Sequence, residues 1–400
     1  ANAADGTVGT VSVQKGNNVS VNGEAPLSLT LDGKDHQSCQ FLSKRAPDEN
    51  HEFTWKEVTT TRGGELAEIL GDQLRSVDSL VVKGNVNDKD FHAMWDASLY
   101  GYLSVINLKN AVLENNAVPD TAFFHENEQY EGSSHEIFYY IGLRKIILPE
   151  GLEKIGEGAF YQASALRQVN FPSTLRYIGD FAFNATKLEM NQLVIPEGVE
   201  EINQYAFAFC RKLKAQVTLP STIKKIGEWA FYGCPITSIN LPEGLESLGS
   251  LAFWDCDLRE VSIPSSCHEF NEGWQFGFNR NLEKMHLPEG MTEIPDHFAV
   301  DCFRLREVNF PHTLKHIGEK AFSLCISLKN VDLPLGMQSL GEEAFSELEA
   351  LEQIVFPASM KSLGKNSCSY WKNIKRIYCA AMEPPVCDPT DGGVFSGFDF

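Results

Sequence analysis

Apolar residues recur along this chain in short blocks, and a proline closes each block. The block before the proline has the form L-x-x-I-x-L, as at Leu258, Val261 and Ile263. Its last two apolar positions flank one outward position, which is the alternation of a half-buried β-strand. Ten such prolines follow one another at intervals of 22 to 24 residues: Pro149, Pro172, Pro196, Pro220, Pro242, Pro264, Pro288, Pro311, Pro334 and Pro357. The interval predicts an internal repeat of about 23 residues.

A second pattern, L-x-x-I-G-x-x-A-F, follows the proline, as from Ile223 to Phe231. The glycine suits a position with positive φ or one where two backbones touch. The phenylalanine should stack in a buried column that runs through the repeats, because each ring buries on the order of 150–250 Å². The column is predicted to contain Phe160, Phe183, Phe207, Phe231, Phe253, Phe298, Phe322 and Phe345. One coil cannot enclose its own apolar face, so the fold class is a stack of coils, an α/β solenoid of mostly short strands with few short helices.

The motif L-P-x-x-L-x-x-I-G-x-x-A-F-x-x-C resembles the leucine-rich repeats of the BspA-like or Treponema pallidum type, and it covers residues 143 to about 379. The resemblance implies a right-handed leucine-rich-repeat superhelix with a parallel sheet on its concave side. It further implies export to the surface of a bacterium of the Bacteroides kind, and roles in adhesion or protein binding.

Three regions are expected. Residues 1–54 show short alternating runs and form a β segment or tether; residues 55–142 form an N-terminal cap with degenerate repeats; residues 143–400 form the solenoid with its C-terminal cap. In the cap, strand signatures occur at Val77, Leu80, Val82 and at Leu103, Ile106, Leu108. A short helix is predicted at Gly64–Leu74, with Leu66, Ile69 and Leu70 directed inward. Another is predicted at Asp88–Ala97, with Phe91, Met94 and Trp95 directed inward. The segment Val118–Phe123 imitates half a repeat, and the polar stretch from Glu126 to Glu136 then reads as an insertion loop.

The repeat between Pro264 and Leu287 departs from the pattern. Trp274 and Phe276 stand where the Ala-Phe pair should, so we interpret them as bulkier rings that repair the column. Near the end of the chain, Cys368 replaces the column phenylalanine.

The formal net charge of −20 argues against nucleic acid or an anionic membrane as a partner. No apolar run is long enough to span a membrane. The small, polar start at Ala1 lacks the regions of a signal peptide and reads as a mature terminus, so that lipid anchoring upstream stays possible.

Five of the ten cysteines recur with the repeat, three or four residues after a phenylalanine, and are expected to be buried thiols rather than bridges or metal ligands: Cys210, Cys234, Cys256, Cys302 and Cys325. Cys379 and Cys387 lie close together and could form a disulfide, whereas Cys39, Cys267 and Cys368 have no evident partner.

The sequence contains no catalytic motif, and no cofactor, metal site or enzyme activity is expected. His312 and His316 fall in an extended segment and should not converge on a metal. Glutamate pairs such as Glu342-Glu343 are interpreted as a solvated face.

The surface expected to bind is the outward column of the strands before the prolines, together with the column two residues earlier. The predicted contact residues are Asn240, Glu260, Ser262, Lys284, His286, Glu307, Asn309 and Asp332. We expect a non-enzymatic extracellular scaffold that binds a host or bacterial surface protein. The alternative is a surface glycan-binding protein, although this strip lacks the exposed aromatic rows that usually stack on sugars.

Overall fold

The computed structural model describes residues 51–124, 141–387 and 393–397. It also gives the backbone of four two-residue strands, β1 (Leu29–Thr30), β2 (Ser38–Cys39), β3 (Phe41–Leu42) and β8 (Phe138–Tyr139). β1 pairs with β2 antiparallel, and β3 pairs with β8 in parallel. Most of the predicted N-terminal segment, residues 1–54, and the predicted insertion loop lie outside the described residues.

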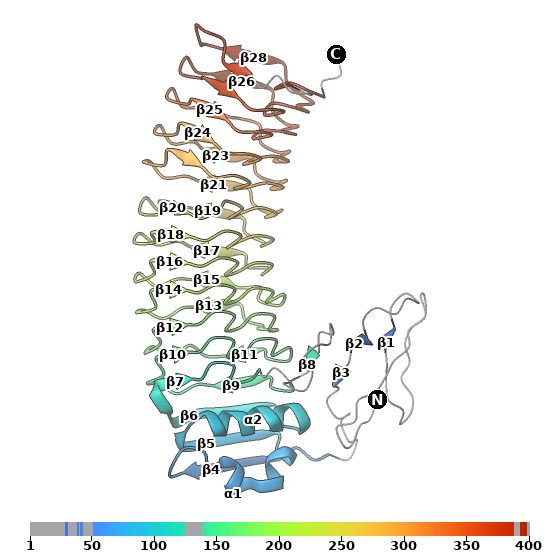
Figure 1. Cartoon of the computed structure of the whole chain (residues 1–400), viewed down its shortest axis with the longest axis vertical. Coiled ribbons are helices and arrows are strands. Elements are labelled where there is room, and N and C mark those ends of the chain that lie inside the picture. The colour runs from blue at the N-terminus through green and yellow to red at the C-terminus, as the bar shows by residue number, and fades with distance from the viewer. Residues whose placement is uncertain are drawn as a thin grey trace. The chain divides into compact units, whose positions relative to one another are not determined.

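The chain forms a β-solenoid of about 13 turns with few helices and coils of about 24 residues, which confirms the predicted fold class. Its residues form two compact units. The first contains residues 1–175 and 179–189, and the second contains residues 176–178 and 190–400. Figure 1 shows the coils of each unit following one another in chain order.

The first unit is built on a parallel five-stranded sheet in the order β11-β9-β6-β5-β4. These strands are β4 (Trp55–Thr60), β5 (Ser79–Val86), β6 (Val105–Leu113), β9 (Lys145–Ile147) and β11 (Gln168–Val169). β5 and β6 confirm the two predicted degenerate repeats, and the six apolar residues of their signatures are at most 1% exposed. A second, short ladder pairs β7 (Ala117–Val118) with β10 (Lys154–Ile155).

Two α-helices, α1 (Leu66–Leu70) and α2 (Asp88–Tyr100), connect the long strands of this unit, with 3₁₀ turns η1 (Gly71–Ser76) and η2 (Glu114–Asn116). A capping box at Asn87 begins α2, and the buried Asp90 carboxylate also accepts from the N–H of Leu66 at the start of α1. The predicted inward positions are confirmed for Leu66, Leu70, Phe91 and Met94. The prediction is wrong for Ile69, which is 49% exposed, because α1 is a short helix that buries only the side with Leu66 and Leu70. Trp95 is half-buried.

The aromatic column begins in the first unit. Phe91 of α2 meets Phe123 edge-on, and Phe123, Phe160 and Phe183 then stack nearly parallel, with ring centroids 5.3 and 5.2 Å apart. Phe123 therefore completes the half-repeat that the sequence indicated at Val118–Phe123.

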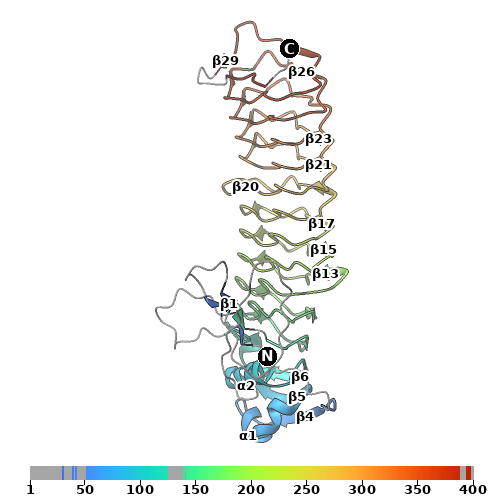
Figure 2. The same cartoon turned by 90° about the vertical axis from the view of Figure 1, so that its right-hand side faces the viewer.

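In the second unit, strands before and after the prolines form ladders on different sides of each coil, and Figure 2 shows β17 and β20 on opposite sides. The front strands precede the prolines: β13 (Gln192–Val194), β15 (Gln216–Thr218), β17 (Ser238–Asn240), β19 (Glu260–Ser262), β21 (Lys284–His286), β23 (Glu307–Asn309), β26 (Gln353–Phe356) and β28 (Arg376–Cys379). They pair in three parallel ladders, β13-β15-β17, β19-β21-β23 and β26-β28.

The back strands follow the prolines: β12 (Tyr177–Ile178), β14 (Glu201–Ile202), β16 (Lys225–Ile226), β18 (Ser247–Leu248), β20 (Glu269–Phe270), β22 (Glu293–Ile294), β24 (His316–Ile317), β25 (Ser339–Leu340), β27 (Ser362–Leu363) and β29 (Val386–Cys387). Within this unit they pair in two parallel ladders, β12 to β20 and β22 to β29.

The L-x-x-I-x-L block before Pro334, Leu328–Leu333, predicts a front strand, but no strand forms there. Leu328 and Val331 are buried and Asp332 is exposed, as the alternation requires, but no ladder includes these residues. The pattern of apolar residues determines which side chains face inward; it does not bring the backbone within hydrogen-bonding distance of the next coil.

The glycine of the repeat is required by close packing between coils. A Cβ atom on Gly227 would lie 2.8 Å from the backbone nitrogen of Gln204, and one on Gly249 would lie 2.4 Å from that of Glu228. Neither residue has a positive φ. Of the two explanations considered from the sequence, positive φ and close backbone contact, the second is therefore correct.

The phenylalanine column continues through the second unit, where Phe207, Phe231, Phe253 and Phe276 stack with centroids 5.3 to 5.6 Å apart and interplanar angles of at most 11°. The carbonyls of six column residues accept a hydrogen bond from a side chain of the following coil. Cysteine thiols donate to the carbonyls of Phe207, Phe231, Phe276 and Ala299. The Asn279 amide donates to the carbonyl of Phe253, and the Trp371 indole N–H donates to that of Phe345.

The five recurring cysteines are buried free thiols, as predicted, and burial raises the pKa of Cys302 to about 12. Cys267 and Cys368 are also buried. The disulfide considered for Cys379 and Cys387 is wrong, because both are free and exposed.

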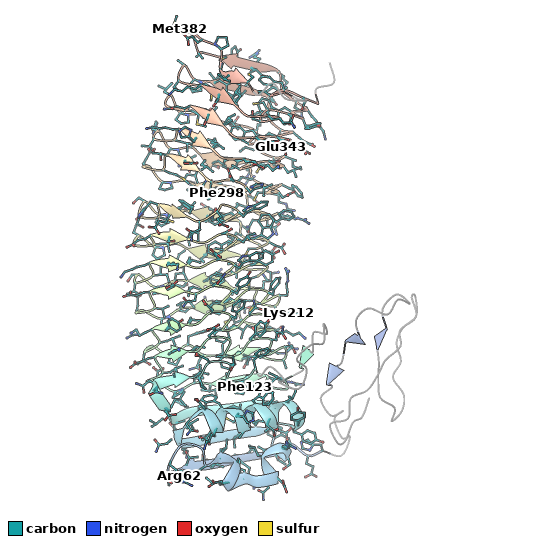
Figure 3. The ribbon with its side chains drawn as sticks, in the orientation of Figure 1. Arg62, Phe123, Lys212, Phe298, Glu343 and Met382 are labelled. Atoms are coloured by element: carbon teal, nitrogen blue, oxygen red, sulfur yellow. The ribbon has the colours of Figure 1, made fainter. Side chains whose placement is uncertain are left out.

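Two predictions about the column are wrong. Phe298 occupies the alanine position, since its carbonyl accepts from the N–H of Phe276 as that of Ala252 accepts from Phe231, and Ala299 takes the phenylalanine position. The buried Phe298 (Figure 3) consequently meets Phe276 edge-on, at 76°. In the preceding coil the alanine position belongs to Gln275 rather than Trp274, because one additional residue precedes it.

Replacing Phe231 by alanine should lower the free energy of unfolding by about 3–5 kcal/mol, because the ring is fully buried between two parallel neighbours. Phe209, 37% exposed, gives a matched control, and Phe209→Ala should cost much less. Urea unfolding followed by circular dichroism measures both, and equal losses would contradict a column that carries the core.

Candidate binding surfaces

Six of the eight predicted contact residues lie side by side on one ladder of the second unit, β19-β21-β23. Its register aligns Glu260, Lys284 and Glu307 in one row. A second row aligns Ser262, His286 and Asn309. We call these two rows the front strip.

The charges of the front strip are paired with one another. Lys284 Nζ lies 3.2 Å from a carboxylate oxygen of Glu307, and His286 Nε2 lies 3.2 Å from one of Glu260. All four side chains are 39–59% exposed, so each pair contributes little to stability and can exchange for a contact with a partner.

The amide of Asn309 holds the backbone instead of facing a ligand. Its Oδ1 accepts from the N–H of Leu287 at 2.9 Å, and its Nδ2 donates to the carbonyl of the same residue at 3.0 Å. Asn240 makes the same two bonds to Leu219, at 2.9 and 3.4 Å. Asparagine at this position therefore extends the ladder by one residue.

The other two predicted contact residues are not brought onto this ladder. Asn240 ends β17, which belongs to the preceding ladder, and Asp332 lies in the segment that forms no strand. Glu260, Ser262, Lys284, His286 and Glu307 remain as side chains that face outward on a single rigid ladder.

A second surface of the second unit is rich in aromatic side chains. They lie just before and just after the column phenylalanines of four successive coils, and we call them the aromatic edge: Tyr205, Phe209, Trp229, Tyr232, Trp254, Trp274 and Phe278. Tyr205 stacks on Trp229 at 5.3 Å, and Tyr232 contacts both Trp229 and Phe209. A second group joins Trp254 to Trp274 and Phe278, at 5.2 and 4.5 Å.

The rings of the aromatic edge are partly exposed, and arginines lie over two of them. Arg211 lies 5.4 Å above Phe209 and also pairs with Asp255 at 2.8 Å, while Arg280 lies 5.6 Å above Phe278. Tyrosine, tryptophan and arginine are the residue types enriched at protein interfaces. The strand positions of the repeat do not reveal this surface; the signal for it in the sequence is aromatic residues at fixed offsets from the Ala-Phe pair.

His297 extends the second aromatic group. Its ring stacks on Trp274 with centroids 3.6 Å apart, and its buried Nδ1 has no hydrogen-bond partner. Burial lowers the pKa of His297, and the nearby Lys320 acts in the same direction, against Glu319 and Asp296.

The remaining chemical candidates do not form a site. His312 pairs with Glu289, and His316 contacts Ser339, so the two histidines have different partners. Of the glutamate pair, Glu342 is exposed and Glu343 half-buried. In the described part of the chain no cluster of three or more His, Cys, Asp or Glu side chains could hold a metal ion, and no helix is long and apolar enough to cross a membrane.

Asn309→Ala should lower the free energy of unfolding by about 1–3 kcal/mol, because it leaves the backbone N–H and carbonyl of Leu287 without their partner. Ser262→Ala, at an exposed position on the same ladder, should change it by less than about 0.5 kcal/mol. Thermal unfolding of both variants checks this, and a neutral Asn309→Ala would show that the amide is replaceable by water.

The lowered pKa of His297 predicts a loss of stability in acid. Its neutral form is favoured in the folded chain, so its contribution is present above the unfolded value of about 6.5 and is lost as pH falls through the lower folded value. His297→Phe keeps the stacking on Trp274 and should flatten this part of the profile. Melting temperatures between pH 7.5 and 5 for both proteins measure the difference, and parallel profiles would contradict the assignment.

Several solved structures of bacterial repeat proteins are similar to this chain. A leucine-rich repeat protein from Bacteroides ovatus is 21% identical with a TM-score of 0.48, over 86% of this chain and 91% of that chain. A leucine-rich cell surface protein from Faecalibacterium prausnitzii is 18% identical (TM-score 0.38; 90% and 96% covered), and the pneumococcal vaccine antigen PcpA is 17% identical (TM-score 0.38; 89% and 86% covered). No curated protein matches the chain.

The family model of the BspA-type leucine-rich repeat region matches six copies, over residues 133–216, 214–322 and 297–382. These ranges cover more than half of the chain and include both rows of the front strip and the aromatic edge. The family supports a repeat-based scaffold for protein interaction. The chain therefore belongs to the BspA-type leucine-rich repeat family.

Proposed function

We propose that this chain is a non-enzymatic, extracellular scaffold that binds a surface protein of a host or of another bacterium. The front strip carries the proposal, with Glu260, Lys284 and Glu307 held in register on a hydrogen-bonded ladder. Because the ladder fixes the backbone beneath these side chains, binding a partner orders only the side chains themselves.

The alternating charges of this row favour a partner with a complementary row. Replacing Glu260 and Glu307 by lysine would place three positive charges side by side and remove both ion pairs of the strip. In the proposed organisation, residues 55–142 cap the solenoid, Asn240 and Asp332 flank the contact surface, and export or lipid anchoring places it outside the cell.

The test is surface plasmon resonance of the purified chain against a panel of extracellular-matrix proteins and bacterial surface proteins. We expect saturable binding to at least one panel member, and a loss of about tenfold or more in affinity for Glu260→Lys with Glu307→Lys. Glu342→Lys, an exposed charge reversal elsewhere in the repeats, is the control and should bind normally. The absence of any saturable partner, or equal loss in the control, would remove the proposal.

A glycan ligand is the second candidate, and the aromatic edge is the observation that favours it. Tyrosine and tryptophan present an apolar ring together with a polar tip, which suits a sugar. However, Tyr205 and Trp229 stack on each other, as do Trp274 and His297, so much of each ring face is already covered. A glycan array in which Trp229→Ala abolishes all signals would favour the sugar, and an array without signals above background would exclude it.

A further inference from the structure

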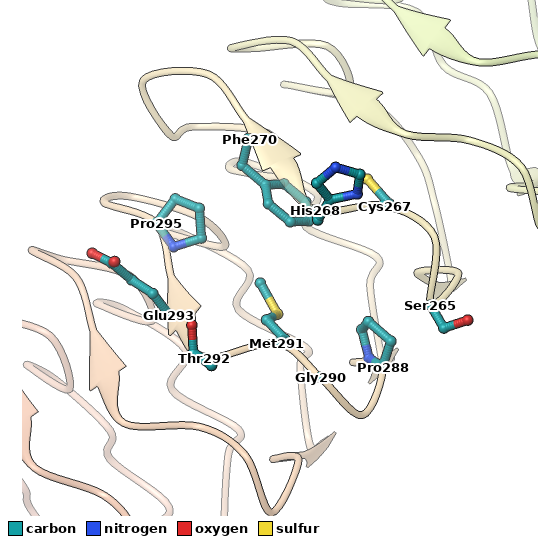
Figure 4. A pocket seen from close by; sticks show the side chains of 10 residues that line it. All are labelled: Ser265, Cys267, His268, Phe270, Pro288, Gly290, Met291, Thr292, Glu293 and Pro295. Atoms are coloured by element: carbon teal, nitrogen blue, oxygen red, sulfur yellow. The ribbon is translucent and has the colours of Figure 1, made fainter.

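The back ladders of the second unit are interrupted once, between β20 and β22. Among the described strands, β20 pairs only with β18, and β22 only with β24. A pocket of about 460 Å³ opens between the two coils at this point (Figure 4). Two strand edges therefore face each other across a space; we call it the slot.

The sequence explains why the ladder breaks here. In the next pair of coils, Gly318 N–H donates to the carbonyl of Ile294 at 2.8 Å. The residue equivalent to Gly318 one coil earlier is Pro295, which has no N–H to offer the carbonyl of Phe270. The preceding coil also carries one additional residue at Glu272-Gly273, where both residues have positive φ. The two coils rejoin at Trp274, whose N–H donates to Asp296 at 3.0 Å.

The edges of the slot retain hydrogen-bonding groups that every regular coil pair uses. In the next pair, His316 N–H donates to the carbonyl of Thr292. The equivalent donor on β22 is the N–H of Glu293, and the equivalent acceptor is the carbonyl of His268, immediately before β20. No backbone hydrogen bond joins β20 to β22 in the described structure. Unpaired strand edges of this kind accept an additional strand.

The lining of the slot combines polar side chains, among them Ser265, His268 and Thr292, with apolar ones. Phe270, Met291 and Pro295 contribute to its lining, together with the buried Cys267. Burial raises the pKa of the Cys267 thiol to about 12, so it remains uncharged and acts as part of an apolar wall. A single aliphatic or aromatic side chain that points inward would cover these residues.

The rim of the slot is acidic. Glu269 on β20 and Glu293 on β22 are exposed, and neither forms an ion pair with a basic side chain in the described structure. In the same outward column, Glu201 does have such a partner in Lys225, at 2.8 Å. A strand inserted between β20 and β22 would place its outward side chains directly beside the two carboxylates, where lysine or arginine would be favoured.

We propose that the slot binds an extended segment of a partner protein, which adds a strand parallel to β20 and β22. The segment has alternating residues, with apolar side chains directed inward and lysine or arginine directed outward. At about 3.3 Å per residue, a stretch of about three to five residues spans the opening. The slot is separate from the front strip, so this inference stands or falls independently of the protein-binding surface proposed there.

The test uses a pool of acetyl-Lys-X-Lys-X-Lys-amide peptides, with X as Val, Ile, Leu, Phe or Tyr, and the matching pool with glutamate in place of lysine. Titration calorimetry should show saturable binding of the lysine pool alone. Hydrogen exchange should show new protection confined to residues 268–271 and 292–294. Glu269→Lys with Glu293→Lys should weaken binding by about tenfold or more, whereas the control Glu342→Lys should not.

Circular dichroism and thermal melting establish that each variant is folded, which is expected because all three glutamates are exposed. Three results would overturn the proposal: no saturable binding up to about 1 mM, equal binding of the glutamate pool, or protection located outside the two edges of the slot. Binding that survives in the double charge reversal would overturn it as well.

Discussion

Backbone hydrogen bonds between neighbouring coils set a separation of about 4.8 Å, and every other feature of this structure has to fit that distance. Phenylalanine rings fit it when they stack in parallel, with centroids 5.2 to 5.6 Å apart. Glycine fits it where two backbones touch, at Gly227 and Gly249. Cysteine, asparagine and tryptophan fit it by donating from one coil to a carbonyl of the preceding one. These residues belong to different chemical classes. They have in common that each makes a contact between one coil and the next at this separation.

The same constraint explains which parts of the structure could be predicted from the sequence. Periodicity located most of the front strands, the recurring buried cysteines and most of the phenylalanine column, because those features repeat with the coil. It could not place Phe298, since an Ala-Phe pair reversed to Phe-Ala has the same composition and nearly the same spacing. It assigned Asn309 to a binding surface, although the amide bonds to backbone, because a polar residue at an outward position looks the same in either role. The slot depends on the missing N–H of Pro295 and on one additional residue in the preceding coil. A search for residues that recur with the repeat does not detect either feature.

The two surfaces of the second unit differ in what they offer a partner. The front strip presents charges that are already paired, and a ligand must replace those pairs with contacts of its own. The aromatic edge presents ring surface and arginine side chains that are only partly covered, which is the composition of an interface centre. The front strip therefore offers charged groups, and the aromatic edge offers ring surface and arginine side chains.

The additional residue at Glu272-Gly273 has a consequence for how such proteins change over evolutionary time. The coil that contains it regains hydrogen bonding with its neighbour within two residues, so the insertion remains a local event. In a solenoid each coil contacts only its neighbours, so an additional residue that is accommodated within one coil leaves the more distant coils unchanged. A proline and one additional residue can thus open a cavity in a repeat protein while the repeats on both sides keep their own packing.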